Sequence, residues 1–220
     1  MMKLLESAGC EVLYNPAQTC CGQPAFNAGY WEDSKAVAKK FCKDFTGHEP
    51  IVSPSGSCTG FVRNYYQKIF GEKAPPECPG EIPQRIFEFT EFFTKQLGIR
   101  KVEGYFEGRA VYHDACGALR ECGIKSGPRE LLSGIRGLEL VEMKEAETCC
   151  GFGGTFAVKY EPISIGMAQT KVQSALDAGA DYIISTDVSC LMHLQGYIDK
   201  MGLPLKTLHI ADVLAAGLGV

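Results

Sequence analysis

A Thr-Cys-Cys-Gly motif in a glycine-rich turn at residues 148–151 constrains this chain more than any other feature. The same four residues recur near the start, at residues 19–22. Adjacent cysteines cannot easily form a disulfide with each other, because that bond strains the peptide between them. Two such pairs in one chain therefore call for a chemical role, either in binding a metal or in thiol chemistry.

The composition excludes several classes of protein. The chain has 220 residues, of which 45% are hydrophobic, so it is long enough to form one large domain or two small ones with real cores. The net charge of -4 and the lack of a basic stretch predict no nucleic-acid partner and no binding to an anionic membrane. We find neither a signal peptide nor a run approaching the roughly 18 apolar residues of a membrane span, and we expect a cytoplasmic protein.

The number of cysteines also indicates a role in metal binding or thiol chemistry. Eleven cysteines are many for a chain of this size. In a reducing compartment, such enrichment indicates metal binding or thiol chemistry rather than a disulfide framework. An odd number also argues against complete internal pairing.

An internal repeat relates the two halves of the chain. Residues 10–70 contain an apolar run, the first Cys-Cys-Gly turn, a helical stretch, a second apolar run, a Ser-Cys pair and a further helix; residues 138–201 contain the same series. The lone cysteine follows the second cysteine of the pair by 37 residues in the first copy and by 40 in the second. Agreement in order, local sequence and spacing makes a chance origin implausible.

The hydrophobic pattern predicts an α/β fold. In the first copy we expect helices over residues 1–8, 31–46, 59–70 and 85–97, and strands over residues 10–15 and 50–54. In the second we expect strands over residues 109–113, 138–143, 181–185 and 205–209, with helices between them. Prolines break the pattern at residues 74–80. We therefore predict two pseudo-repeated lobes, residues 1–98 and 99–220, each a mainly parallel sheet flanked by helices.

The first lobe lacks a counterpart of the strand that opens the second. That strand, over residues 109–113, leads to Cys116, whereas the first copy begins in what should be the following helix. We expect either that this lobe lacks its first strand or that the natural protein is longer at its N-terminus.

The repeated cysteines follow the C-terminal ends of predicted strands. In a parallel sheet these ends lie along one edge, where residues far apart in sequence converge. Four thiolates around one point are the ligands of a zinc or iron-sulfur centre. The candidate ligands of the second lobe are Cys116, Cys149, Cys150 and Cys190. The first lobe offers an incomplete set, Cys20, Cys21 and Cys58.

Other residues are candidates for supporting roles. Gly22, Gly151 and Gly153 let the backbone bend close to a cluster and donate N–H groups to sulfur. His113 is a candidate partner of the ligands or a fourth ligand. His193, three residues after Cys190, is a candidate supporting residue that could also ligate from the first turn of a helix. Positive charge near an anionic centre could come from Arg120, Lys159 and Lys171, although a solvated face is the default for each. The remaining cysteines are expected to be small buried hydrophobes: Cys10, Cys42, Cys78 and Cys122.

These motifs resemble a known family. The paired turns, each followed by a cysteine about 40 residues on, are similar to the cysteine-rich CCG domain of the heterodisulfide reductases and of the iron-sulfur subunit of glycolate oxidase. The similarity is greater to the lactate utilisation protein A, or YkgE-like, group. It is carried by the motifs at residues 18–24, 54–58, 112–116, 149–159 and 186–192.

The resemblance implies an iron-sulfur redox subunit, with a cluster of the 4Fe-4S type, that transfers electrons during oxidation of L-lactate to pyruvate without NAD. It also implies a ferredoxin-like iron-sulfur subunit and a third subunit as partners. The chain departs from the family at its missing first strand. It also departs at the Cys-x-x-Cys element, which here reads Cys58 to Phe61 and Cys190 to His193.

Two alternatives remain open at this point. The same thiolates can hold zinc in a structural or scaffold subunit. The vicinal cysteines can also act without metal as a thiol oxidoreductase, although no Cys-x-x-Cys motif at a helix start supports that chemistry.

Overall fold

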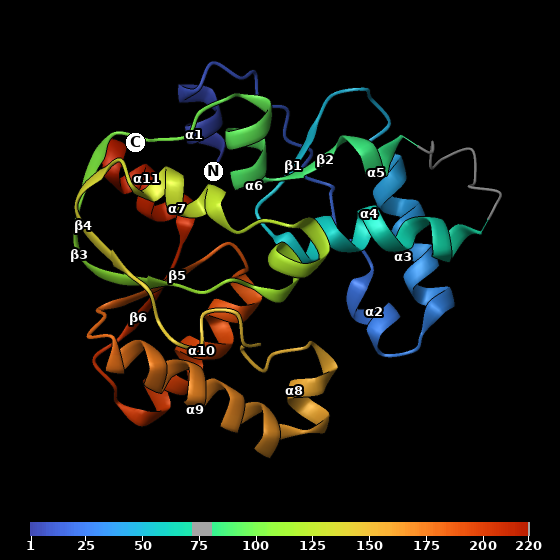
Figure 1. Ribbon diagram of the computed structural model, residues 1–220. Coiled ribbons are helices and arrows are strands. Elements are labelled where there is room, and N and C mark those ends of the chain that lie inside the picture. Colours follow the sequence, from blue (N-terminus) through green and yellow to red (C-terminus); the bar gives the residue numbers. More distant parts are fainter. Residues whose placement is uncertain (72–80, 220) are drawn as a thin grey trace.

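Two parallel sheets flanked by helices form the framework of the molecule, a computed structural model that describes residues 1–71 and 81–219 (Figure 1). The larger sheet has the strand order β4-β3-β5-β6, and the smaller one pairs β1 with β2. All pairings in these residues are parallel, which confirms the predicted α/β class. The strands are β1 (Ile51–Ser53), β2 (Ile86–Glu88), β3 (Gly104–Tyr112), β4 (Ile135–Val141), β5 (Tyr182–Ser185) and β6 (Lys206–His209).

The helices of the described residues connect these strands. In the first half they are α1 (Met2–Ser7), α2 (Gln23–Asn27), α3 (Trp31–Asp44), α4 (Gly56–Phe70), α5 (Ile82–Arg85), α6 (Phe89–Glu91) and the π-helical turn η1 (Phe92–Gln96). In the second half they are the π-helical turn η2 (Gly117–Glu121), α7 (Ser126–Leu132), α8 (Thr155–Lys159), α9 (Glu161–Asp177), α10 (Val188–Met201) and α11 (Ile210–Leu218).

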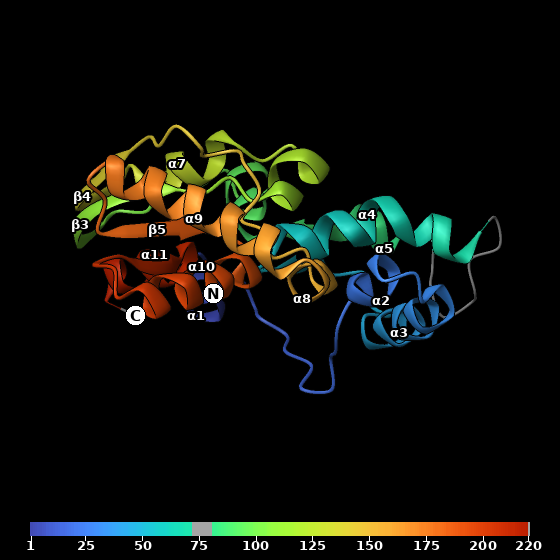
Figure 2. The same ribbon diagram turned by 90° about the horizontal axis from the view of Figure 1, so that it is seen from below.

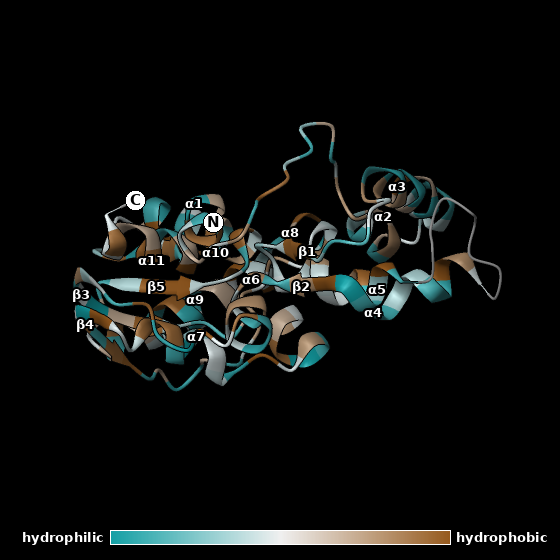
Figure 3. Ribbon diagram, turned by 90° about the horizontal axis from the view of Figure 1, so that it is seen from above, coloured by the Kyte–Doolittle hydropathy of each residue, from teal (hydrophilic) through white to brown (hydrophobic). Residues whose placement is uncertain are grey.

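Helices cover both faces of the four-stranded sheet. Alternate residues of a strand point to opposite faces: Val111 and Ile183 pack toward α9 and α10, whereas Ala110 and Ile184 pack toward α7 and α11. Figure 1 shows α7 and α11 on one side of β5 and α9 and α10 on the other. Because both faces are covered, β5 is an apolar run without a polar face, as the brown strand in Figure 3 shows.

The two-stranded sheet of the first lobe also has two buried faces. Ile51 and Ile86 are paired in register and pack against an aromatic core from α3 and α4. Their neighbours Val52 and Phe87 contact the core of the larger sheet. The small sheet thus lies between the two cores.

Helix α1 and residues 89–96 pack in the same core as the four-stranded sheet. Leu4 is fully buried there, together with Phe89, Phe93 and Leu131. Residues before the proposed boundary therefore contribute to both cores, and the division into residues 1–98 and 99–220 stays a prediction.

The two halves share one order of elements after each Cys-Cys-Gly turn. In the first half, two helices, β1, α4, the short α5, β2 and α6 follow the turn; in the second, two helices, β5, α10, β6 and α11 follow it, with no helix in the place of α5. A side chain at the end of the last strand then caps the next helix in both halves, Glu88 in the first and His209 in the second. The two pseudo-repeated lobes stay a prediction.

The strand predicted over residues 10–15 is wrong. These residues form a loop between α1 and α2, and Figure 2 shows that loop projecting from the body of the molecule. Leu13 and Tyr14 are 72% and 59% exposed, so the apolar run is not covered by a core. It lies beside no strand with which its backbone groups can pair in the described part of the chain.

The helix predicted over residues 85–97 begins later than expected. Residues 86–88 form β2, because their backbone pairs with β1. The helical segment begins at Phe89, where the Glu88 carboxylate accepts hydrogen bonds from the N–H groups of Thr90 and Glu91. Tertiary pairing therefore overrides the helical spacing of the apolar residues.

The predicted break in the pattern at residues 74–80, which includes Cys78, lies outside the described residues. In residues 1–71 and 81–219, no helix combines the length and the apolar character that crossing a membrane requires.

Replacing Leu4 tests whether α1 belongs to the core of the large sheet. Because Leu4 is 0% exposed, Leu4→Ala should lower the free energy of unfolding by about 2–5 kcal/mol. The matched control Leu13→Ala, in the exposed loop, should change it by less than about 0.5 kcal/mol. Urea unfolding followed by circular dichroism measures both, and equal losses would contradict this packing.

Glu88 is a buried carboxyl whose ionisation depends on its surroundings. Its Oε2 accepts hydrogen bonds from Thr90 N at 2.9 Å and Glu91 N at 3.1 Å, while Oε1 has no partner among the described residues. Burial raises the pKa of Glu88 to about 7, although these hydrogen bonds act in the opposite direction.

Glu88→Gln should therefore alter the dependence of stability on pH. The folded state holds the proton of Glu88 more tightly than the unfolded chain, where glutamate titrates near pH 4.3, so its contribution to stability falls as the pH rises toward about 8. Relative to the wild type, the variant should gain on the order of 3 kcal/mol between about pH 4.5 and about pH 8. Urea unfolding across this range, with the exposed Glu11→Gln as control, measures the gain; a pH-independent difference would refute the raised pKa.

Candidate metal-binding site

Three loops of the second lobe meet at the C-terminal edge of the four-stranded sheet. Cys116 follows β3, the pair Cys149 and Cys150 follows β4, and Cys190 lies in the first turn of α10 after β5. Because β3 lies between β4 and β5, these loops leave adjacent strands at the point where the strand order reverses. The structure thus brings together the four cysteines predicted for this lobe.

The four thiols form a continuous chain of contacts. Cys116 is hydrogen-bonded to Cys149, Cys149 to Cys150, and Cys150 to Cys190. The hydrogen bond from Cys116 lowers the pKa of Cys149, while the bonds to their neighbours and burial raise the pKa values of Cys116 and Cys150. Sulfurs this close cannot all be thiolates unless a cation offsets their charge.

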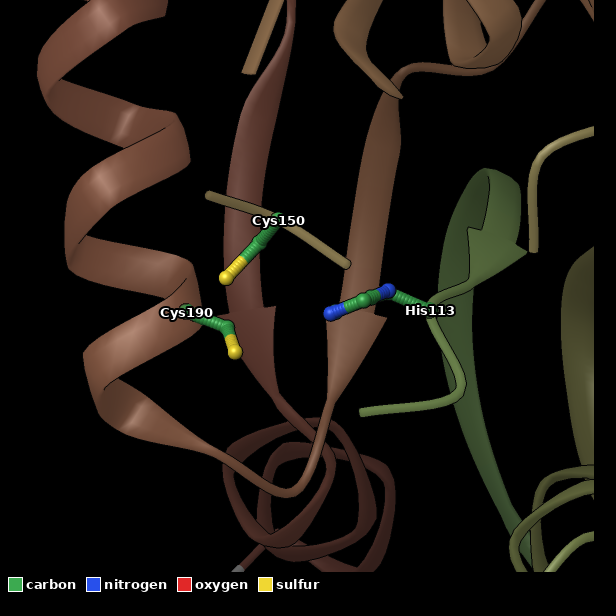
Figure 4. A group of neighbouring side chains, drawn as sticks. All are labelled: His113, Cys150 and Cys190. Carbon is green, nitrogen blue, oxygen red and sulfur yellow. The ribbon is translucent and has the colours of Figure 1, made fainter. Parts of the chain in front are cut away.

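His113 lies beside this chain of thiols. Its side chain is fully buried, and its ring nitrogens have no hydrogen-bond partner among the described residues. The ligand atoms of His113, Cys150 and Cys190 lie within 4.8 Å of one another (Figure 4). Burial, followed by the charge of Lys171, lowers the pKa of His113 to about 3.

The glycine turn after the cysteine pair directs backbone N–H groups at the sulfurs. Gly151 N donates to Cys149 Sγ at 3.4 Å, and Phe152 N donates to Cys150 Sγ at 3.5 Å. Gly151 has a φ of 96°, and a Cβ there would lie 2.6 Å from the carbonyl oxygen of Ser164. Glycine is therefore required for both conformation and space.

The first lobe repeats this turn. Gly22 has the same φ of 96°, and its N–H donates to Cys20 Sγ at 3.4 Å. The hydroxyl of Ser34 donates to Gly22 O at 3.0 Å, as Ser164 does to Gly151 O at 2.8 Å. The two Cys-Cys-Gly turns thus have the same local geometry.

The first-lobe cysteines are also in contact. Cys21 is hydrogen-bonded to Cys20 and Cys58. The bond from Cys21 lowers the pKa of Cys20 to about 6 and lowers that of Cys58. Cys21 is buried and Cys20 is exposed. This set of three is smaller than that of the second lobe, and its part in a metal site stays a prediction.

A buried carboxylate joins the two sets. Asp187, in the loop that leads to Cys190, accepts hydrogen bonds from the hydroxyls of Ser55 and Ser57 at 2.6 Å and 2.7 Å. Ser55 in turn accepts a bond from the backbone N–H of Cys58 at 3.4 Å. The two candidate sites therefore lie side by side rather than at opposite ends of the molecule.

Other predicted residues occupy supporting or separate positions. His193 Nε2 lies 3.2 Å from the Ser164 hydroxyl, so this histidine supports the glycine turn. Gly153 lies in that turn with a φ of 52°. Cys42 is buried, whereas Cys10 and Cys122 are partly buried against apolar cores. None of these three belongs to either chain of sulfur contacts at the strand ends.

For Lys171, the default expectation of a solvated face is wrong, whereas the alternative of a positive charge near the cysteines fits its position. It is 1% exposed, and its ammonium donates to the carbonyls of Glu145 and Ala146 just before the cysteine pair. Burial lowers its pKa to about 8. The burial of Lys171 could have been predicted from the sequence, because it lies at helical spacing from Ala168 and Ala175, which are both fully buried. Arg120 and Lys159 are exposed, as expected.

Comparisons with known proteins agree with this geometry. The cysteine-rich domain family, CCG, matches residues 1–63 and 110–195, which include the seven candidate ligands. Among curated proteins, a lactate utilization protein A of Halalkalibacterium halodurans is 41% identical over 213 residues, 97% of this chain and 87% of the relative. Another of that name, from Geobacillus kaustophilus, is 40% identical over 218 residues, 98% of this chain and 90% of the relative.

Gly151→Ala should destabilise the protein more than Gly154→Ala. Both glycines have a positive φ, but a Cβ at Gly154 meets no atom within 4 Å. The clash at Gly151 should add at least about 1 kcal/mol to the loss of unfolding free energy. Urea unfolding of the metal-free, reduced protein measures this difference, and equal losses would show that the turn has room for a side chain.

Proposed function

Because the chain belongs to the cysteine-rich domain family, CCG, we propose that it is an iron-sulfur redox subunit that transfers electrons during oxidation of L-lactate to pyruvate. The observation that carries the proposal is the chain of four thiols where three neighbouring strands end. The lactate substrate comes from the names of the relatives, which match nearly the whole chain.

The residues of the second lobe fit such a centre. Cys116, Cys149, Cys150 and Cys190 would hold it, and the proposed cluster is of the 4Fe-4S type. Two backbone N–H groups already point at Cys149 and Cys150, where they stabilise thiolate charge. In the first lobe, Cys20, Cys21 and Cys58 would hold a second centre or part of one.

An iron-sulfur centre supplies one-electron transfer when bound. Oxidation of lactate to pyruvate releases two electrons and two protons, so a subunit of this kind must work with other carriers. The chain's own part is to hold the sulfurs, exclude water from Cys150 and Cys190, and leave Cys20 exposed at the surface. We expect this role to be performed in the cytoplasm.

A surface near the second-lobe site supports the proposal of partner subunits. Val158, Tyr160 and Ile163 are 84%, 54% and 58% exposed, on α8 and at the start of α9. These elements follow directly after the Cys-Cys-Gly turn. Exposed apolar groups next to a redox site suit the docking of a ferredoxin-like iron-sulfur subunit and a third subunit.

A zinc-binding scaffold is the second candidate function. The buried group of His113, Cys150 and Cys190 has the nitrogen and sulfur donors that zinc also prefers. Metal analysis separates the two candidates, provided that the protein is purified without oxygen.

Iron analysis of anaerobically purified protein tests the proposal. Serine at Cys116, Cys149, Cys150 or Cys190 should reduce the bound iron and acid-labile sulfide by about half if each lobe holds one centre, or nearly abolish them if only the second lobe does. Cys10→Ser, outside both thiol groups, is the matched control and should retain the wild-type content.

Three results would overturn the iron-sulfur assignment. A wild-type protein with stoichiometric zinc and no sulfide would favour the scaffold. A metal-free protein whose Cys149 and Cys150 oxidise reversibly would favour thiol chemistry. Unchanged iron content in all four serine variants would place the centre elsewhere.

A further inference from the structure

We propose that Lys171 is a positioning residue of the second-lobe centre and that its buried positive charge raises the reduction potential of that centre. The inference rests on the proposed function, because it concerns how readily the same centre takes up an electron. It gives a buried residue of α9, outside both sets of cysteines, a part in electron transfer.

Helix α9 holds the loop of the second cysteine pair at both of its ends. Before the pair, the ammonium of Lys171 donates to the carbonyl oxygens of Glu145 and Ala146, the second at 3.2 Å. After the pair, the hydroxyl of Ser164 donates to the carbonyl oxygen of Gly151 at 2.8 Å. Lys171 thus places a positive charge against the backbone that leads into the two cysteines.

The charge of Lys171 has no direct ion pair in the described part of the chain. Its side chain is 1% exposed, and its hydrogen-bond acceptors there are neutral carbonyls. The carboxylates of Asp114 and Glu145 act on it only from a distance, because they are bonded to Arg129 and to the hydroxyl of Thr148. A buried charge is costly unless it is paired, so a negatively charged centre held by thiolates suits this position.

The charge of Lys171 acts on the cysteine pair. Burial lowers the pKa of Lys171 to about 8, whereas the negative charges of Cys150, Glu145, Asp114 and Cys149 raise it. Because the attraction between two charges is mutual, the ammonium also stabilises negative charge on these two sulfurs. Reduction adds one negative charge to a centre held by them, so the ammonium favours the reduced state.

The first lobe shows that a Cys-Cys-Gly turn forms without such a lysine. The hydroxyls of Ser34 and Ser164 hold the glycine carbonyls of the two turns, and both glycines have a φ of 96°. Seven residues after these serines, α3 carries the buried Phe41 and α9 carries Lys171. An apolar side chain at this position is therefore compatible with the turn, and the lysine supplies a charge rather than a shape.

Two neutral replacements separate the charge of Lys171 from its hydrogen bonds. Lys171→Met removes both, whereas Lys171→Gln keeps a donor for the carbonyls and removes only the charge. In full-length protein purified anaerobically with its iron, each should shift the reduction potential of the second-lobe centre to a more negative value. Lys171→Arg, which keeps the charge, should shift it less than either.

An anaerobic redox titration followed by EPR measures this potential, after the iron content of each variant has been determined. Lys144→Met, which removes an exposed charge from the same loop, is the matched control and should leave the potential unchanged, because water and salt screen an exposed charge. If both lobes hold a centre, the signal that disappears in Cys150→Ser identifies the one that should shift.

The possible outcomes separate this inference from the proposed function. More negative potentials in both neutral variants support the inference, as does loss of iron from both of them but not from Lys171→Arg. Unchanged potentials in the iron-loaded variants, an equal shift in Lys144→Met, or loss of iron from all three Lys171 variants would overturn it and leave the proposed function intact. A wild-type protein that holds zinc, or no metal at all, would overturn the proposed function, and the inference with it.

Discussion

The parallel direction of β4, β3 and β5 is the constraint on which the candidate site depends. Parallel strands end at one edge of a sheet, so the loops after these three strands must meet there. If β3 ran antiparallel to its neighbours, His113 and Cys116 would lie at the opposite edge from Cys150. Sheet topology therefore assembles a ligand group from residues that are up to 77 positions apart.

The Cys-Cys-Gly turn adds local geometry to this topology. In both lobes the glycine has a φ of 96° and donates its N–H to the first sulfur of the pair. A serine hydroxyl from the next long helix, Ser34 or Ser164, holds the glycine carbonyl. One cysteine of each pair is buried and the other is more exposed, so each turn presents an inner and an outer sulfur.

Most buried polar residues around the site have hydrogen-bond partners. Asp114 is neutralised by Arg129, Asp187 is satisfied by the hydroxyls of the first lobe, and Lys171 by two backbone carbonyls. Burying such groups costs free energy unless their hydrogen bonds are replaced. The ring of His113 faces the sulfurs of Cys150 and Cys190.

The sequence alone determined the α/β class, the strands of the second lobe and the four cysteines that follow them, because hydrophobic periodicity and a repeated motif are local signals. The sequence-based predictions were wrong for the secondary structure of residues 10–15 and 86–88 and for the default exposure of Lys171. In each case the neighbouring elements of the tertiary structure decide the outcome. An apolar triplet forms a strand only beside a partner, which β1 gives to Ile86 and no described strand gives to Leu13. Only the tertiary structure decided that the two sets of cysteines adjoin through Asp187 and that His113 faces Cys150 and Cys190, since distances between loops follow from sheet order and packing rather than from spacing along the chain.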